Sequence, residues 1–111
     1  MDVTRWDDPA EHDTPYDGAE RRLLAYDDTL QLNHNALEEG IEYPVHSHEE
    51  TVQGMFVVEG EVEIYGDETV RLEEGDSIII DAGQHHGIRG IAPHSALLVA
   101  STPPSGLPST E

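Results

Sequence analysis

The sequence predicts an all-β protein built as a small sandwich or barrel. Short segments alternate apolar and polar residues with a period of two, and glycine-containing turns separate them at intervals of about ten residues. No stretch has a convincing helical periodicity. Short strands at this spacing pack as two sheets or close into a barrel. At 111 residues the chain has room for one such domain.

Seven segments are expected to form strands. The clearest is Glu61-Val62-Glu63-Ile64, in which both apolar side chains fall on one face and both glutamates on the other. Gly60, Gly66 and Gly75 mark tight turns, because glycine adopts a positive φ without steric cost. The expected strands are residues 21–26, 29–37, 52–58, 61–65, 69–72, 76–80 and 95–100.

Both ends of the chain are expected to lie outside the barrel, which the sequence places at residues 19–101. Residues 1–18 form an acidic arm, disordered in part unless it packs on the barrel or on a second subunit. Residues 102–111 are rich in proline and serine and are expected to leave the domain.

The charge is extreme, with 24 acidic residues against five arginines, no lysine and a net charge of -19. Such a chain repels itself at low ionic strength, and molar salt screens that repulsion. The composition resembles that of proteins from salt-in halophiles, particularly haloarchaea. Nucleic acid is excluded as a partner, because nothing here would neutralise phosphates.

Two absences narrow the class of protein further. There is no cysteine, which excludes disulfides and thiolate metal sites. No apolar run reaches the ~20 residues that span a bilayer, and residues 1–4 lack an export signal. We therefore expect a cytoplasmic protein that does not bind a membrane.

Four residues stand out as candidate metal ligands, namely His46, His48, Gln53 and His86. Residues two apart on a strand face the same side, so His46 and His48 can direct two imidazoles to one point. His86 must come from a different strand. Three imidazoles and one side-chain carbonyl suit a divalent transition metal, and the sequence does not choose among Fe, Mn, Ni, Co, Cu and Zn.

Glycines at fixed distances frame these residues. Gly40 to Gly60 read Gly-x5-His-x-His-x4-Gln-x6-Gly, and Gly75 to Gly90 read Gly-x5-Asp-x-Gly-x2-His-x3-Gly. The two segments resemble the paired motifs of the cupin superfamily, whose members are double-stranded β-helix or jelly-roll barrels. The resemblance extends over roughly residues 20–101. It implies that His46, His48, Gln53 and His86 are the metal ligands.

The chain departs from the family pattern at three positions. Gln53 replaces the usual glutamate, Asp81 replaces a proline and Gly90 replaces an asparagine. Without a carboxylate ligand an M²⁺ centre keeps its full charge, which favours anionic or chelating ligands and lowers affinity for the metal itself. The family spacing selects His86 over His85, which is expected at the surface.

The resemblance favours a cupin that binds a divalent metal and acts on a small oxygen-rich molecule, with lyase, isomerase or hydrolase chemistry. Some small cupins with a His-His-Gln-His set promote ring opening of unsaturated uronic acids. They use additional polar and cationic groups near the barrel end, where this chain has the apolar run 97–100. Arg22, Arg71 and Arg89 are expected in surface ion pairs rather than at the site.

Two alternatives remain open, a metal-dependent dioxygenase and a non-enzymatic module that binds a small ligand. The catalytic residues are unassigned, although Tyr26, Asn35 and Tyr43 are possible proton donors. A homodimer formed through the N-terminal strands is expected, with Trp6 and Tyr16 as interface aromatics. An apolar lining around the metal is expected from Met55, Val57, Ile78, Ile80 and Ile88.

Overall fold

The computed structural model describes residues 1–104 of the chain, and these contain strands and turns but no helix. These residues therefore include no helix that could cross a membrane. The ten strands are β1 (Glu11–Tyr16), β2 (Ala19–Tyr26), β3 (Gln31–Glu38), β4 (Glu42–His46), β5 (Val52–Glu59), β6 (Glu61–Gly66), β7 (Val70–Glu73), β8 (Ser77–Ile80), β9 (His86–Gly90) and β10 (His94–Thr102).

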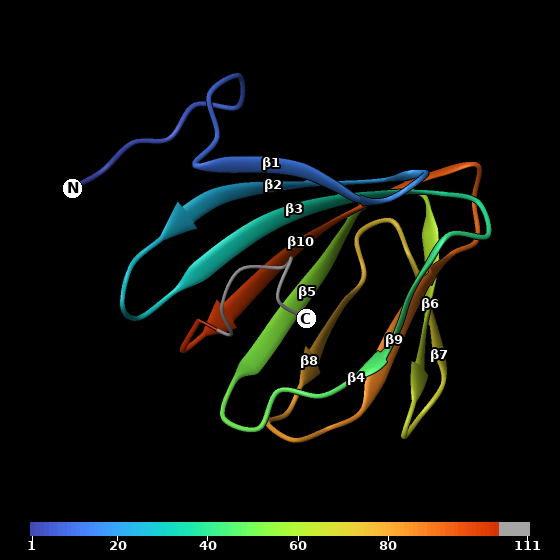
Figure 1. The fold of residues 1–111 in the computed structure, drawn as a ribbon. Coiled ribbons are helices and arrows are strands. Elements are labelled where there is room, and N and C mark those ends of the chain that lie inside the picture. The colour runs from blue at the N-terminus through green and yellow to red at the C-terminus, as the bar shows by residue number, and fades with distance from the viewer. Residues whose placement is uncertain (105–111) are drawn as a thin grey trace.

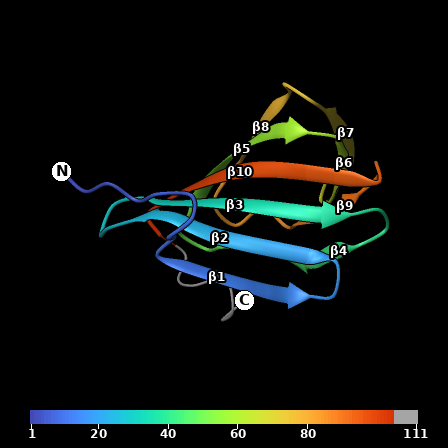
Figure 2. The same ribbon diagram turned by 90° about the horizontal axis from the view of Figure 1, so that it is seen from above.

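The strands form two sheets that face each other (Figure 1). The larger sheet has the order β1-β2-β3-β10-β5-β8, and the smaller has the order β4-β9-β6-β7. Neighbouring strands in both sheets are antiparallel. Seen from above, β10 lies near the middle of the larger sheet, beside β3 and β5 (Figure 2). The predicted all-β barrel is confirmed.

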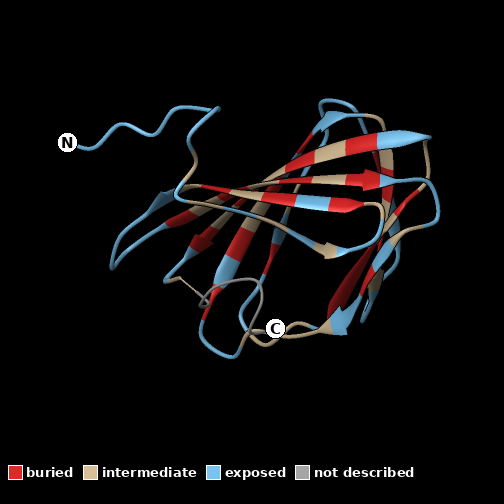
Figure 3. Cartoon of the chain, turned by 45° about the horizontal axis from the view of Figure 1, so that its top comes forward, coloured by how far each residue is buried: buried red, intermediate tan, exposed pale blue. Residues whose placement is uncertain are grey.

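The core lies between the sheets and follows the period-two alternation of their strands. Buried and half-buried residues alternate along β3 and β10 of the larger sheet (Figure 3). On the smaller sheet Val62 and Ile64 are buried, as the alternation of residues 61–64 predicts. The core cluster comprises Ala19, Leu37, Tyr43, Met55, Val57, Val62, Ile64, Leu72, Ile80, Ile88, Leu97 and Val99.

Three strands were not predicted from the sequence, and each has a weak pattern. β1 lies within the segment expected to be an arm, and it pairs with β2 at the edge of the larger sheet. Its proline is compatible with an edge strand. β4 also contains a proline, and β9 contains Gly87 and Gly90. A Cβ on Gly87 would meet the Tyr65 ring at 2.7 Å, so close packing requires glycine there.

The inner face of β3 corrects the expectation of an apolar interior. Gln31, Asn33 and Asn35 are buried between the sheets, whereas Leu32 is only half-buried and lies on the outer face. The register with β10 fixes this choice, because Gln31 lies opposite the buried Ser101. A shift of one residue would turn the three amides outward.

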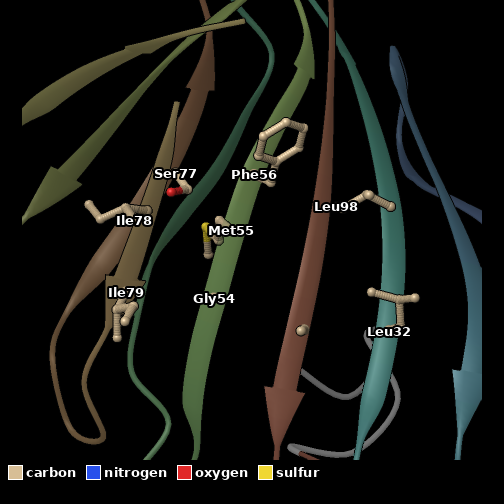
Figure 4. A pocket seen from close by; sticks show the side chains of 9 residues that line it. Leu32, Gly54, Met55, Phe56, Ser77, Ile78, Ile79 and Leu98 are labelled. Atoms are coloured by element: carbon tan, nitrogen blue, oxygen red, sulfur yellow. The ribbon is translucent and has the colours of Figure 1, made fainter. Parts of the chain in front are cut away.

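The outer face of β3, β10, β5 and β8 is apolar and holds a hollow of about 340 Å³. Phe56 and Leu98 lie at one end of this hollow, and Ile79 lies across from Leu32 at the other (Figure 4). Ile79 is 69% exposed. No acidic side chain lines this hollow, although the chain has 24 acidic residues.

Candidate metal centre

The pairing of β4 with β9 in the smaller sheet brings three of the candidate ligands together. His46 ends β4 and lies directly opposite His86, the first residue of β9, and their ring centroids are 4.5 Å apart. The His48 ring lies 4.9 Å from that of His46 and 5.6 Å from that of His86. One ring nitrogen from each histidine lies within 4.8 Å of the others, so one ion can be held by all three.

His48 reaches the cluster in a different way from the one expected. β4 ends at His46, so His48 is in the following loop and strand alternation does not orient it. Its backbone carbonyl accepts a hydrogen bond from the Gly83 amide at 2.7 Å. This bond ties the loop after β4 to the turn before β9.

Gln53 joins the cluster from β5, on the opposite sheet. Its side chain is buried, and its Oε1 lies 3.1 Å from Nε2 of His86. Its Nε2 donates a hydrogen bond of 3.0 Å to Oγ of Ser101 on β10. Because the amide group donates to Ser101, its oxygen is turned toward the histidines.

Two backbone carbonyls set the tautomers of the histidine rings. The Nδ1 atom of His46 lies 2.8 Å from the Pro44 carbonyl, and that of His86 lies 3.0 Å from the Gln84 carbonyl. A carbonyl only accepts, so each Nδ1 carries the proton and each neutral ring has its lone pair on Nε2. Metal-ligating histidines have this arrangement, with the second nitrogen bonded to a carbonyl or carboxylate.

With this tautomer, both atoms that meet in the contact between His86 and Gln53 are hydrogen-bond acceptors. Nε2 of the neutral ring and Oε1 of the amide both present lone pairs, 3.1 Å apart. Two ligand atoms each ~2.1 Å from one ion and at right angles lie ~3 Å apart. The donor set therefore fits a divalent transition metal held by three neutral imidazoles and one amide oxygen.

Burial lowers the pKa of His48 below its ordinary value, and the neighbouring His46 lowers it further. His48 therefore stays neutral to lower pH than an exposed histidine would. Burial also raises the pKa of Tyr43 to about 12, so its phenol stays protonated. The Tyr43 hydroxyl lies 3.4 Å from Oδ1 of Asn35 and donates to it.

The remaining histidines lie away from the cluster. His85 is exposed, and its backbone amide donates to Asp67 at 2.9 Å. His12 lies 3.1 Å from Glu20. His34 packs edge-on against Trp6, with ring centroids 4.8 Å apart. Burial lowers its pKa.

One arginine, Arg21, is buried, which was not predicted from the sequence. Its guanidinium makes two contacts of 3.3 and 3.4 Å with Asp13, and it lies 5.7 Å from the centre of the Tyr43 ring. The period-two series Ala19, Arg21, Leu23 on β2 is the signal that would have found it. Gln31, Asn33 and Ser101 were likewise not predicted as interior polar residues, although they too lie on the buried face of an alternating strand.

The other arginines of the barrel lie at the surface. Arg71 pairs with Glu61 and Glu63 at 3.6 and 3.7 Å, and Arg89 pairs with Glu63. Arg22 lies over the Trp6 ring at 4.3 Å and donates to the Trp6 carbonyl. Arg71 and Arg89 therefore form the surface ion pairs expected of them, and Arg22 packs on Trp6.

Comparison with known proteins agrees with this architecture. The cupin domain family model matches residues 34–100, which include all four candidate ligands. No curated protein matches the chain in sequence.

Solved structures match the chain over nearly its whole length. KdgF from Halomonas sp. aligns with a TM-score of 0.84 at 23% identity, covering 93% of this chain and 95% of its own. An RmlC-like cupin from Shewanella frigidimarina has a TM-score of 0.83 at 24% identity, with 94% and 92% coverage. TT1209 from Thermus thermophilus has a TM-score of 0.76 at 26% identity, with 93% and 98% coverage.

Proposed function

Because the chain belongs to the cupin domain family, we propose that it binds one divalent transition metal and acts on a small oxygen-rich molecule at that metal. The observation that carries the proposal is the 3.1 Å approach of two lone-pair atoms, Nε2 of His86 and Oε1 of Gln53. One ring nitrogen each of His46 and His48 lies within 4.8 Å of one of His86, which completes the donor set.

Each protein group has a defined task at this centre. The carbonyls of Pro44 and Gln84 keep the Nδ1 protons of two histidines in place, and Ser101 orients the Gln53 amide. A metal held there would act as a Lewis acid toward an oxygen of the bound molecule. Since Gln53 and the histidines are neutral, the ligands leave the metal charge undiminished.

The surroundings favour chemistry that needs little help from a protein base. Of the three proton donors considered, Tyr43 keeps its proton and gives its hydrogen bond to Asn35. Tyr26 is 55% exposed at the end of β2. These placements support Lewis-acid lyase, isomerase or hydrolase chemistry, or binding without turnover, over a mechanism with a tyrosine base.

A metal-dependent dioxygenase is the remaining alternative and is separable by experiment. The apoprotein is loaded separately with Zn²⁺ and Fe²⁺, its metal content is measured by mass spectrometry, and turnover of candidate oxygen-rich substrates is followed with and without oxygen. We expect one metal per chain and turnover with Zn²⁺ in the absence of oxygen. Turnover only with Fe²⁺ and with oxygen uptake would identify a dioxygenase, and the absence of bound metal would refute the proposal.

We also propose that the chain forms a homodimer in the cytoplasm of a salt-adapted organism. The net charge of -19 supports salt adaptation. Trp6 and Tyr16, the aromatics expected at the interface, make contacts within the chain with His34 and Tyr43. The outer face around Phe56 and Ile79 is a second candidate interface, because no charged residue lines its hollow.

A further inference from the structure

The loop that carries His48 is joined to the rest of the barrel at two points. It comprises residues 47–51, between the end of β4 and the start of β5, so neither strand orients the His48 ring. Within the loop, the His48 carbonyl accepts a hydrogen bond of 2.7 Å from the Gly83 amide. At the end of the loop, the Thr51 hydroxyl donates to the Pro103 carbonyl at 2.9 Å, to a residue 52 positions along the chain.

A proline stands where the pairing of β5 with β10 ends. The two strands pair as far as Val52 and Thr102, and the next residues in register are Thr51 and Pro103. Proline has no N–H group, so residue 103 cannot donate a backbone hydrogen bond to β5. The Thr51 hydroxyl supplies a hydrogen bond at this position instead. The contact between the two strands therefore extends by one residue, as far as the loop of His48.

Thr51 is the buried residue of this loop. It is only 5% exposed, whereas Glu49 and Glu50 are exposed and Ser47 is half-buried. A buried hydroxyl keeps its acceptor, because loss of the hydrogen bond would leave a polar group without either a partner or water. Thr51 therefore fixes the end of the loop, and only two residues separate it from His48.

The histidine cluster depends on this loop for one of its three rings. His46 and His86 lie opposite each other on paired strands, so the register sets their separation. The His48 ring lies 4.9 Å from that of His46 and 5.6 Å from that of His86, and no strand pairing holds it there. A shift of the loop end would therefore move the His48 nitrogen away from the other ligand atoms.

We propose that Thr51 is a positioning residue for the metal centre. Its hydroxyl, bonded to the Pro103 carbonyl, holds the loop in the conformation that directs the His48 ring toward the ion. This inference rests on the proposed metal-dependent function and deepens it, because it names a residue that sets the metal affinity from outside the ligand set. If Thr51 served only the stability of the fold, its hydroxyl would not change the ligands around a bound metal.

Three variants separate positioning from a general structural role. Thr51→Val keeps the branched shape and removes the hydroxyl, whereas Thr51→Ser keeps the hydroxyl. Thr102→Val is the matched control, because it removes a threonine hydroxyl that donates to the Thr29 carbonyl at 2.8 Å, in the turn between β2 and β3. Each full-length protein in molar NaCl is titrated with Zn²⁺ by calorimetry, and its Co²⁺ form is examined by visible absorption, which reports the ligand set. The metal-free proteins are unfolded with denaturant.

We expect Thr51→Val to raise the Kd for Zn²⁺ about tenfold and to change the Co²⁺ spectrum, because a ligand is displaced. Thr51→Ser should have the Kd and spectrum of the unsubstituted chain, and Thr102→Val should leave both unchanged. Thr51→Val should still unfold cooperatively without metal.

Several results would overturn the inference and leave the metal function standing. They are an unchanged Kd or Co²⁺ spectrum in Thr51→Val, a Thr51→Ser protein that binds as weakly as Thr51→Val, and an equal loss of affinity in Thr102→Val. A Thr51→Val protein that does not fold would also overturn it, since the hydroxyl would then hold the fold rather than the ligand. If the unsubstituted chain binds no Zn²⁺, the proposed function fails, and this inference with it.

Discussion

His86 and Gln53 approach each other across the barrel with two acceptor atoms 3.1 Å apart, Nε2 of the ring and Oε1 of the amide. Each atom is held in this orientation by a hydrogen bond on its other side, to the Gln84 carbonyl and to the Ser101 hydroxyl respectively. Lone pairs directed at one another repel unless a cation lies between them. The folded chain thus prepares a cation site from two opposite sheets.

The choice between adjacent histidines gives the first prediction. His86→Ala removes a metal ligand. It should therefore weaken metal binding by more than ~100-fold, the most that is expected when a residue that only hydrogen-bonds to a ligand is replaced. His85→Ala should leave the affinity unchanged, since His85 is exposed and contacts Asp67. Isothermal titration with Zn²⁺ measures both variants, and equal losses would contradict the assignment.

Gln53 should set the strength of metal binding through its neutral charge. Gln53→Glu places a carboxylate beside the cation, and we expect the Kd for Zn²⁺ to fall about tenfold. The Ser101 hydroxyl can turn to donate to the new carboxylate. Ser101→Ala is the companion variant, and loss of its orienting bond should raise the Kd about tenfold. An unchanged Kd in Gln53→Glu would place residue 53 outside the centre.

Metal affinity should depend on pH near the ordinary histidine pKa of 6.5. Three neutral rings must bind the ion, so protons compete as the pH falls below this value. The depressed pKa of His48 means that the unfolded apoprotein binds more protons than the folded one just below pH 6.5. Stability of the apoprotein should therefore decline below pH 6.5 and not above it. Zn²⁺ titrations and melting curves of the apoprotein from pH 8 to pH 5 check the trends in affinity and in stability respectively. A metal Kd that is constant over this range would contradict the first trend.

Removal of the Asn33 amide should stabilise the metal-free protein. Asn33→Leu replaces a buried oxygen that has no hydrogen-bond donor, and the free energy of unfolding should rise by about 1 kcal/mol. Denaturant unfolding of the metal-free protein measures this change. A clear loss of stability would show instead that the Asn33 side chain makes a stabilising contact.

The outer apolar face should mediate the homodimer. In molar NaCl, where charge repulsion is screened, light scattering should give twice the chain mass of 12.2 kDa. Phe56→Glu should give monomer, because it places a charge in the apolar face. Val70→Glu, a similarly exposed position on β7, should remain dimeric. A monomer of the unsubstituted chain under these conditions would refute the dimer.

Period-two alternation and glycine turns were sufficient to predict the all-β class. Gly60 and Gly75 have φ values of 81° and 91°, as tight turns require. β1, β4 and β9 have weak patterns and were not predicted, because they are held by pairing partners that local sequence does not specify. The glycine-framed spacing also identified the four residues that the fold brings together.

What the sequence alone determined, then, was the fold class and the identity of the clustered residues. Tertiary structure decided which face of β3 lies inside and which hydrogen bonds orient the ligands. Pairing with β10 turned Gln31, Asn33 and Asn35 inward, and pairing of β2 with β3 turned Arg21 inward, where it contacts Asp13 of β1. The physical reason is register, because a strand with polar residues on one face and apolar residues on the other can present either face to the core until its neighbours are fixed.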